Sequence, residues 1–145
     1  DGRYIKEWGK KGWGPGDFDL PHALAMDSLG RLFVADRNNN RIQIFDQDGK
    51  LLDSWKQWSR PSGIFIAADD TMYVADSESW GPDNPGWKKG IRIGSAKDGT
   101  VKYFIPDPSS KPGIALAEGV SADATGNVIY AAGQSSTTVH KFVRK

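Results

Sequence analysis

The strongest constraint on the fold of this 145-residue chain is an internal repeat. The segment from Leu20 to Trp55 has a weaker copy that starts at Arg60 and a third copy that starts near Glu118. Repetition along a chain indicates a fold in which similar units pack side by side. The copies share a short apolar strand, which reads Phe33-Val34-Ala35-Asp36, then Tyr73-Val74-Ala75-Asp76, then Ile129-Tyr130-Ala131-Ala132.

Each copy consists of short strands separated by turns. In the first copy we expect strands at residues 23–26, 31–35, 41–45 and 50–55, with Asp-Gly or Leu-Gly turns between alternating apolar runs. No window has the 3.6-residue periodicity of a helix. Antiparallel strands that repeat every 40 residues or so form the blades of a β-propeller. We therefore predict an all-β propeller unit over residues 1–145, with blades at 20–58, 60–105 and 118–145.

The two ends of the chain predict how the ring closes. Residues 1–9 resemble the fourth strand of the first copy, because both begin with Asp-Gly and lead to a Trp. The third copy stops after its third strand. Since propellers need at least about four blades, we predict a homodimer with a six-bladed ring, in which residues 1–9 are the closing outer strand of the partner's third blade. The alternative is a piece of a longer propeller.

Composition excludes several classes of protein. The chain has 19 Lys and Arg against 18 Asp and Glu, and this net charge of +1 argues against a nucleic-acid partner. No apolar run approaches the roughly 18 residues of a membrane helix, so we expect no membrane partner. The absence of Cys excludes disulfides, thiolate metal sites and a Cys nucleophile, and it leaves the compartment open. Phosphate loops and nucleophile elbows are also missing from the sequence.

The first copy resembles the NHL repeat family. The resemblance rests on Pro21 to Asp27 (Pro-x-Ala-x-Ala-x-Asp), the Val-Ala-Asp strand, Asn39-x-Arg41-Ile42 and the Phe45-Asp46-x-Asp48-Gly49 turn. Within that family the sequence is most similar to the peptidyl-α-hydroxyglycine α-amidating lyases and their bacterial relatives. Such a lyase is a six-bladed propeller that holds zinc near its axis through His residues from separate blades, so the resemblance implies an axial metal site.

The resemblance also assigns candidate site residues. His22 matches the Pro-His metal-ligand motif, and its equivalents in the other copies are Ser62 and Glu118. Arg37 follows Val-Ala-Asp, where the lyase has an active-site Arg that would serve as a fixed fork for a carboxylate. The chain has only two His and lacks the Tyr that the lyase carries after this strand. A two-fold ring would place two copies each of His22 and Glu118 around the axis, a donor set suited to zinc or another divalent cation.

Two functions from different classes follow. The first is a metal-dependent, lyase-like enzyme with an axial site, in which His22 and Glu118 bind the metal and Arg37 is catalytic. The second is a non-catalytic binding or scaffold propeller for a protein, peptide or small-molecule ligand, in which His22 contacts only backbone and water. The insertion at residues 77–90 has two Trp, two Pro and three Gly. It predicts a binding loop that presents Trp80 and Trp87.

Overall fold

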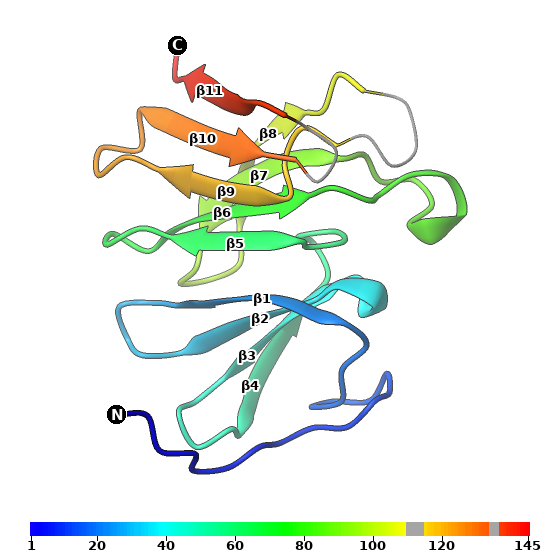
Figure 1. Cartoon of the computed structure of the whole chain (residues 1–145), viewed down its shortest axis with the longest axis vertical. Coiled ribbons are helices and arrows are strands. Elements are labelled where there is room, and N and C mark those ends of the chain that lie inside the picture. Colours follow the sequence, from blue (N-terminus) through cyan, green and yellow to red (C-terminus); the bar gives the residue numbers. More distant parts are fainter. Residues whose placement is uncertain (110–114, 134–136) are drawn as a thin grey trace.

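Three antiparallel sheets lie side by side in an open arc (Figure 1). The computed structural model describes residues 1–109, 115–133 and 137–145. The expected all-β fold is confirmed, with sheets of four, four and three strands in simple up-and-down order. Sheet one contains β1 (Pro21–Met26), β2 (Leu32–Asp36), β3 (Arg41–Phe45) and β4 (Leu51–Trp55). Sheet two contains β5 (Gly63–Ile66), β6 (Thr71–Asp76), β7 (Gly90–Ser95) and β8 (Val101–Pro106), and sheet three contains β9 (Gly119–Ala122), β10 (Val128–Ala132) and β11 (Val139–Val143).

The first strand of each sheet is the innermost. β1 lies beside β5, and β5 lies beside β9, so these three strands line one side of the arc (Figure 1). Two short 3-10 helices follow the second strands of sheets one and two: η1 (Arg37–Asn39) and η2 (Gly81–Asp83). None of the described helices is long and apolar enough to cross a membrane. The arrangement is that of propeller blades around an axis.

Backbone register shows how the three repeats correspond. Ala35 pairs with Ile42 in sheet one, and Ala75 pairs with Ile91 in sheet two. In sheet three the turn between the first two strands is one residue longer, because the Asp123 N–H donates to the Val128 carbonyl, whereas the Ala67 N–H donates to Thr71. The expected equivalence of Ala35 and Ala75 with Ala131 is therefore wrong by one residue, and Ala132 occupies that position.

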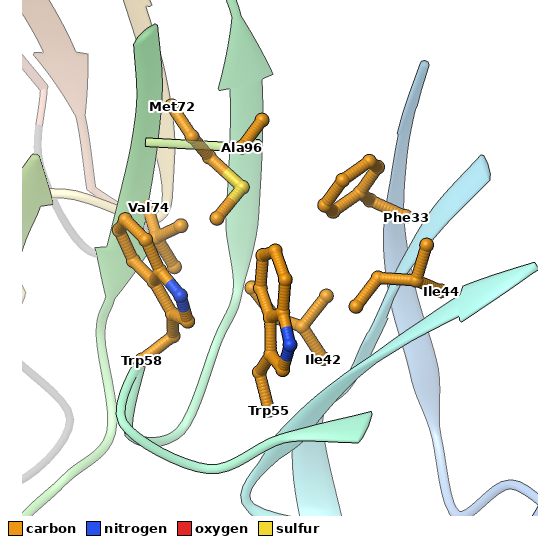
Figure 2. Packing of buried hydrophobic residues seen from close by; sticks show 8 residues of the cluster. All are labelled: Phe33, Ile42, Ile44, Trp55, Trp58, Met72, Val74 and Ala96. Atoms are coloured by element: carbon orange, nitrogen blue, oxygen red, sulfur yellow. The ribbon is translucent and has the colours of Figure 1, made fainter. Parts of the chain in front are cut away.

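Apolar side chains fill the spaces between neighbouring sheets. The first core cluster lies between sheets one and two, where Trp55 and Trp58 pack against aliphatic side chains from both sheets (Figure 2). Each fully buried large side chain of this kind contributes about 1.5–3 kcal/mol. The second cluster lies between sheets two and three. The buried members of the first cluster are Phe33, Ile42, Ile44, Trp55, Trp58, Met72, Val74 and Ala96, and those of the second are Tyr73, Ala75, Ile91, Ala117, Ile129 and Ala131.

Buried ion pairs tie the end of the second strand to the third strand in each four-stranded sheet. Arg41 Nε donates to Asp36 Oδ2 at 2.7 Å, and Arg92 Nη1 donates to Asp76 Oδ2 at 3.2 Å. The Asp36 carboxylate also accepts the backbone N–H of Asp19 at 2.8 Å, so it fixes the connection that precedes β1. These carboxylates are fully buried and partnered, which gives them a structural role.

Residues 1–9 follow an extended path across sheet one without belonging to any strand of this chain (Figure 1). Trp8 packs against Phe45 with ring centroids 6.0 Å apart, and Lys6 Nζ donates to the Asp48 carbonyl. Among the described residues, no fourth strand pairs with β11. A closing strand contributed to a partner stays a prediction, as does the dimeric ring.

A hydrogen-bonded contact between turns links sheets one and two and generates a prediction. Ser28 donates to the Asp70 carboxylate from its hydroxyl at 2.7 Å and from its backbone N–H at 2.8 Å. These hydrogen bonds hold the pKa of the Asp70 carboxyl below its ordinary value of 3.8. The stabilisation is therefore complete above pH 3.8 and is lost as the pH falls through the lower pKa of the folded state.

We expect Asp70→Asn to lower the free energy of unfolding at pH 7, because the amide replaces a charged acceptor. The difference from the unchanged chain should shrink as the pH falls below 3.8 through the lower pKa of the folded state, because the Asp70 side chain then becomes neutral as well. Urea denaturation at each pH measures it. Asp69→Asn is the comparison variant: Thr71 in its own turn also lowers the pKa of the Asp69 carboxyl, so this variant shows the pH dependence of a carboxylate that accepts no hydrogen bond from sheet one among the described residues. A difference for Asp70→Asn that stays constant over this pH range would contradict the assignment.

Candidate functional site

Equivalent positions on three blades converge at one end of the innermost strands. Ser62 and Glu118 immediately precede β5 and β9, and their backbone N–H groups donate to Ala75 and Ala132, respectively, each at 2.8 Å. His22 is the second residue of β1, at a bulge between Pro21 and Leu24. The register therefore places His22, Ser62 and Glu118 at corresponding positions, and the structure brings all three side by side.

His22 bridges the neighbouring blades. Its Nδ1 lies 2.8 Å from the Ser62 carbonyl oxygen, and its Nε2 lies 3.2 Å from Glu118 Oε1. Because a carbonyl oxygen only accepts hydrogen bonds, Nδ1 carries a proton. The ring orientation is thus fixed by the backbone of the second blade, and Nε2 is directed at the carboxylate of the third.

Arg37 joins the same carboxylate from the other side. It is the first residue of η1, and its Nη1 lies 3.2 Å from Glu118 Oε1 and 3.6 Å from Glu78 Oε1. Arg60 extends the network, since its Nη2 donates to Glu78 Oε2 at 3.3 Å. We call these five side chains, His22, Arg37, Arg60, Glu78 and Glu118, the inner-end cluster. Basic and acidic side chains alternate through it.

The sequence analysis placed His22, Arg37 and Glu118 among the candidates, and the structure brings these three together. It did not identify Arg60 or Glu78. Glu78 belongs to the 77–90 insertion, for which the sequence analysis predicted a role for the two Trp residues only. Arg60 precedes Pro61, at the start of the second blade. Both are charged side chains beside repeat positions, since Glu78 lies two residues after the Val-Ala-Asp strand of the second copy and Arg60 precedes Pro61, but the repeat does not specify the paths of their loops.

The ion pairs of the inner-end cluster are longer than ideal charged hydrogen bonds. The N–O distances of its arginine–carboxylate pairs run from 3.2 to 3.6 Å, whereas 2.7–2.9 Å is the usual range for N⁺–H···O⁻ contacts. The Arg37 side chain is only 11 % exposed, and its Nε is buried without a hydrogen-bond partner among the residues that the structure describes. A guanidinium with loose partners and an unused donor is suited to exchange one carboxylate for another.

A metal ion does not fit the donors that one chain supplies. Among the described residues, no three His, Cys, Asp or Glu side chains are grouped so as to hold an ion. His22 and Glu118 provide two donors, and Arg37 already contacts the carboxylate oxygen that faces His22. Zinc sites use three or four protein ligands. The predicted His22–Glu118 metal site would therefore need donors from a second chain.

The predicted binding loop has a fixed base and exposed aromatic side chains. Ser79 donates to Asp76 and Asn84 donates to Ser59, and all four residues are buried. Trp80 and Trp87 remain 43 % and 40 % exposed. Trp87 also stacks on the Arg92 guanidinium, which lies 5.0 Å from the ring centroid. Part of the Trp87 ring therefore packs on Arg92 within sheet two, and its position alone does not indicate a bound ligand.

The buried carboxylate of Asp36 and the partly exposed carboxylate of Glu118 give a testable contrast in stability. Asp36→Asn removes one member of a buried ion pair and should lower the free energy of unfolding by about 3 kcal/mol. Glu118→Gln acts on a partly exposed pair and should lower it by less than about 1 kcal/mol. Urea denaturation at pH 7 measures both, and equal losses would mean that the inner-end cluster is a folding element rather than a site.

Comparison with known proteins agrees with the repeat found in the sequence. Residues 18–45, which include His22 and Arg37, match the NHL repeat. Human NHL repeat-containing protein 3 is 52 % identical over 70 residues, covering 46 % of this chain and 20 % of that protein. Peptidyl-glycine alpha-amidating monooxygenase B of Xenopus laevis is 27 % identical over 158 residues, covering 98 % of this chain and 17 % of that protein. The expected relation to the amidating enzymes is thus confirmed as sequence similarity.

A solved structure supports the fold. Hydrazine synthase from Kuenenia stuttgartiensis superposes with a TM-score of 0.62 over 97 % of this chain and 36 % of that one, at 17 % identity. The chain spans about a fifth or less of the length of the two relatives named above. The repeat match, these relatives and the propeller-like sheets lead to one conclusion: residues 18–45 are an NHL repeat, and the chain is a propeller-like unit related to NHL-repeat proteins.

Proposed function

We propose that the inner-end cluster is a non-catalytic binding site for a peptide or small molecule that ends in a carboxylate. The observation that carries this proposal is the Arg37 guanidinium, which is held between two carboxylates at 3.2 and 3.6 Å and keeps a buried donor that has no partner within residues 1–109, 115–133 and 137–145. Arginine binds carboxylates well because its N–H groups match the two oxygens in geometry and charge. The carboxylate of the ligand replaces Glu118 at Arg37.

Neighbouring groups favour a ligand with a polar backbone. Once a ligand displaces Glu118, His22 Nε2 is released from its 3.2 Å contact and faces the ligand. Glu78 stays with Arg60 and supplies an acceptor for an N–H group of the ligand. Donors and acceptors on both sides of one cation suit the last residue of a peptide, which carries an amide N–H as well as the carboxylate.

A second candidate is the metal-dependent lyase implied by the amidating relatives. One observation favours it: His22 Nε2 and Glu118 Oε1 face each other across 3.2 Å, from separate blades. The donors of one chain do not suffice, so this candidate requires a ring that brings two such pairs together. The salt-bridged state of the cluster supports the binding function over the lyase.

A matched pair of peptides tests the binding function. We expect a short peptide with a C-terminal Gly acid to bind at least ten times more tightly than the same peptide with a C-terminal amide, because only the acid pairs with Arg37. Isothermal titration calorimetry measures both dissociation constants. Arg37→Met should remove the preference, whereas Arg3→Met, on the N-terminal segment, should leave it unchanged. Equal affinity for acid and amide would overturn the proposal.

A zinc titration separates the two candidates. If the site is a binding site only, Zn²⁺ alone should give no stoichiometric heat, and a peptidyl-α-hydroxyglycine substrate should not be cleaved with or without Zn²⁺. One tightly bound ion per two chains that is lost in His22→Ala, together with substrate cleavage, would favour the lyase instead. Gln57→Ala is a control variant for the titration because Gln57 lies outside the inner-end cluster and bonds to the Gly99 carbonyl.

A further inference from the structure

Arg60 lies between the first and second blades, at the inner-end cluster. It precedes Pro61 in the connection between β4 and β5. The turns that follow β2 and β6 lie at the same end of their sheets (Figure 1). Arg60 contacts both turns, η1 on the first blade and Glu78 on the second, and its side chain is only 11 % exposed. Its side chain is therefore held by groups from two blades.

Each of the five N–H groups of the Arg60 guanidinium has an acceptor. On the first blade, Nη1 donates to the Arg37 carbonyl at 3.3 Å and to Asn40 Oδ1 at 3.2 Å, and Nη2 donates to Asn38 Oδ1 at 2.8 Å. On the second blade, Nη2 and Nε donate to Glu78 Oε2 at 3.3 and 3.4 Å. All the donors of Arg60 are thus used within the chain.

Arg37 uses its donors differently. Its Nη1 is shared between Glu118 at 3.2 Å and Glu78 at 3.6 Å, and its Nε has no partner in the described part of the chain. One arginine of the inner-end cluster is thus fully hydrogen-bonded and the other is not. A fully bonded guanidinium is suited to hold its neighbours in place, whereas a partly bonded one can accept a further carboxylate.

The repeat itself does not require a cation at the position of Arg60. Arg60 is the first residue of Arg-Pro-Ser (60–62), whose counterparts are Leu-Pro-His (20–22) in the first copy and Leu-Ala-Glu (116–118) in the third. Both counterparts of Arg60 are therefore leucines. Since the other two blades form with an apolar residue there, a largely buried charge at this position indicates a role outside the general fold.

The Glu78 carboxylate lies between the two arginines. Its Oε2 is bound by Arg60, and its Oε1 lies 3.6 Å from Arg37 Nη1, which is longer than the usual charged hydrogen bond of about 2.7–2.9 Å. The Glu78 side chain is 34 % exposed, so it is not locked by packing. Without Arg60, Arg37 would be the one remaining ion-pair partner of Glu78 among the described residues, and the two would close to an ordinary ion pair.

We propose that Arg60 is a positioning residue that holds Glu78 away from Arg37 and thereby keeps Arg37 available to the carboxylate of a ligand. This inference rests on the proposed function of the inner-end cluster. Arg60 also binds the Arg37 carbonyl, so it fixes the backbone from which the ligand-binding guanidinium projects. With Glu78 restrained, the ligand has only Glu118 to displace from Arg37.

A double-mutant cycle tests this role. Isothermal titration calorimetry gives the dissociation constant of a short peptide with a C-terminal Gly acid. We expect Arg60→Met to weaken binding about tenfold, because Glu78 then pairs with Arg37 and competes with the peptide. Adding Glu78→Gln to Arg60→Met should restore the affinity to within about threefold of the unchanged chain, whereas Glu78→Gln alone should change it less than about twofold. A role in folding alone would not be rescued in this way.

Arg31→Met is the matched control for the loss of an arginine. Arg31 also links the first two blades, because its Nη2 donates to the Ala96 carbonyl at 2.8 Å, but it lies at the opposite end of β2 from η1. Arg31→Met should leave the affinity for the acid peptide unchanged. Circular dichroism verifies that each variant is folded.

A second substitution covers the case in which Arg60→Met does not fold. Arg60→Lys keeps one cation beside Glu78 but cannot form the five hydrogen bonds of the guanidinium. We expect Arg60→Lys to weaken binding of the acid peptide by a smaller factor, and Glu78→Gln should remove that loss as well.

The outcomes separate this inference from the proposed function. If the unchanged chain prefers the acid over the amide, unaltered affinity in the Arg60 variants would overturn the role of Arg60 alone. A loss of affinity that Glu78→Gln does not restore would also overturn it. Equal affinity of the unchanged chain for acid and amide would overturn the proposed function and this inference together.

Discussion

Packing of one apolar sheet face on the next is the interaction on which the rest of this structure depends. Each sheet is only four strands wide at most, which is too small to bury a core by itself. The middle sheet buries side chains on both faces, with Met72 and Val74 directed to one cluster and Tyr73 and Ala75 to the other. Alternation along a single strand thus joins three sheets into one body. The same alternation leaves the first and last sheets with one uncovered face each.

The polar site exists because packing and recognition use different parts of the strand. The middles of the strands are apolar and buried between sheets, whereas their ends and the following turns project from the stack. His22, Arg37 and Glu118 all lie at such ends, so they meet without disturbing the core. Asp36, the residue before Arg37, shows the contrast. It is fully buried and forms an ion pair with Arg41, so its role is structural.

The repeat made the fold predictable from the sequence, because the same strand and turn pattern occurs three times. Grouping of His22, Arg37 and Glu118 was also predictable, since repeats place equivalent residues at the same end of successive blades. Two features were not. The first is the alignment of sheet three with the other two sheets, which is shifted by one residue because the turn from Asp123 to Val128 is one residue longer. Aligning the apolar strands of the sequence does not reveal this extra residue. Arg60 and Glu78 join the cluster through loop paths that no repeat position specifies.

The hydrogen bond from His22 Nδ1 to the Ser62 carbonyl has a consequence for how such a ring evolves. The imidazole belongs to the first blade, but its orientation is set by the backbone of the second, and its other nitrogen is directed at the third. The angle between neighbouring blades therefore determines how His22, the Ser62 carbonyl and Glu118 are placed relative to one another. In a closed propeller the number of blades sets the angle between neighbours, so a change in blade number would also move the Ser62 carbonyl and Glu118 relative to His22.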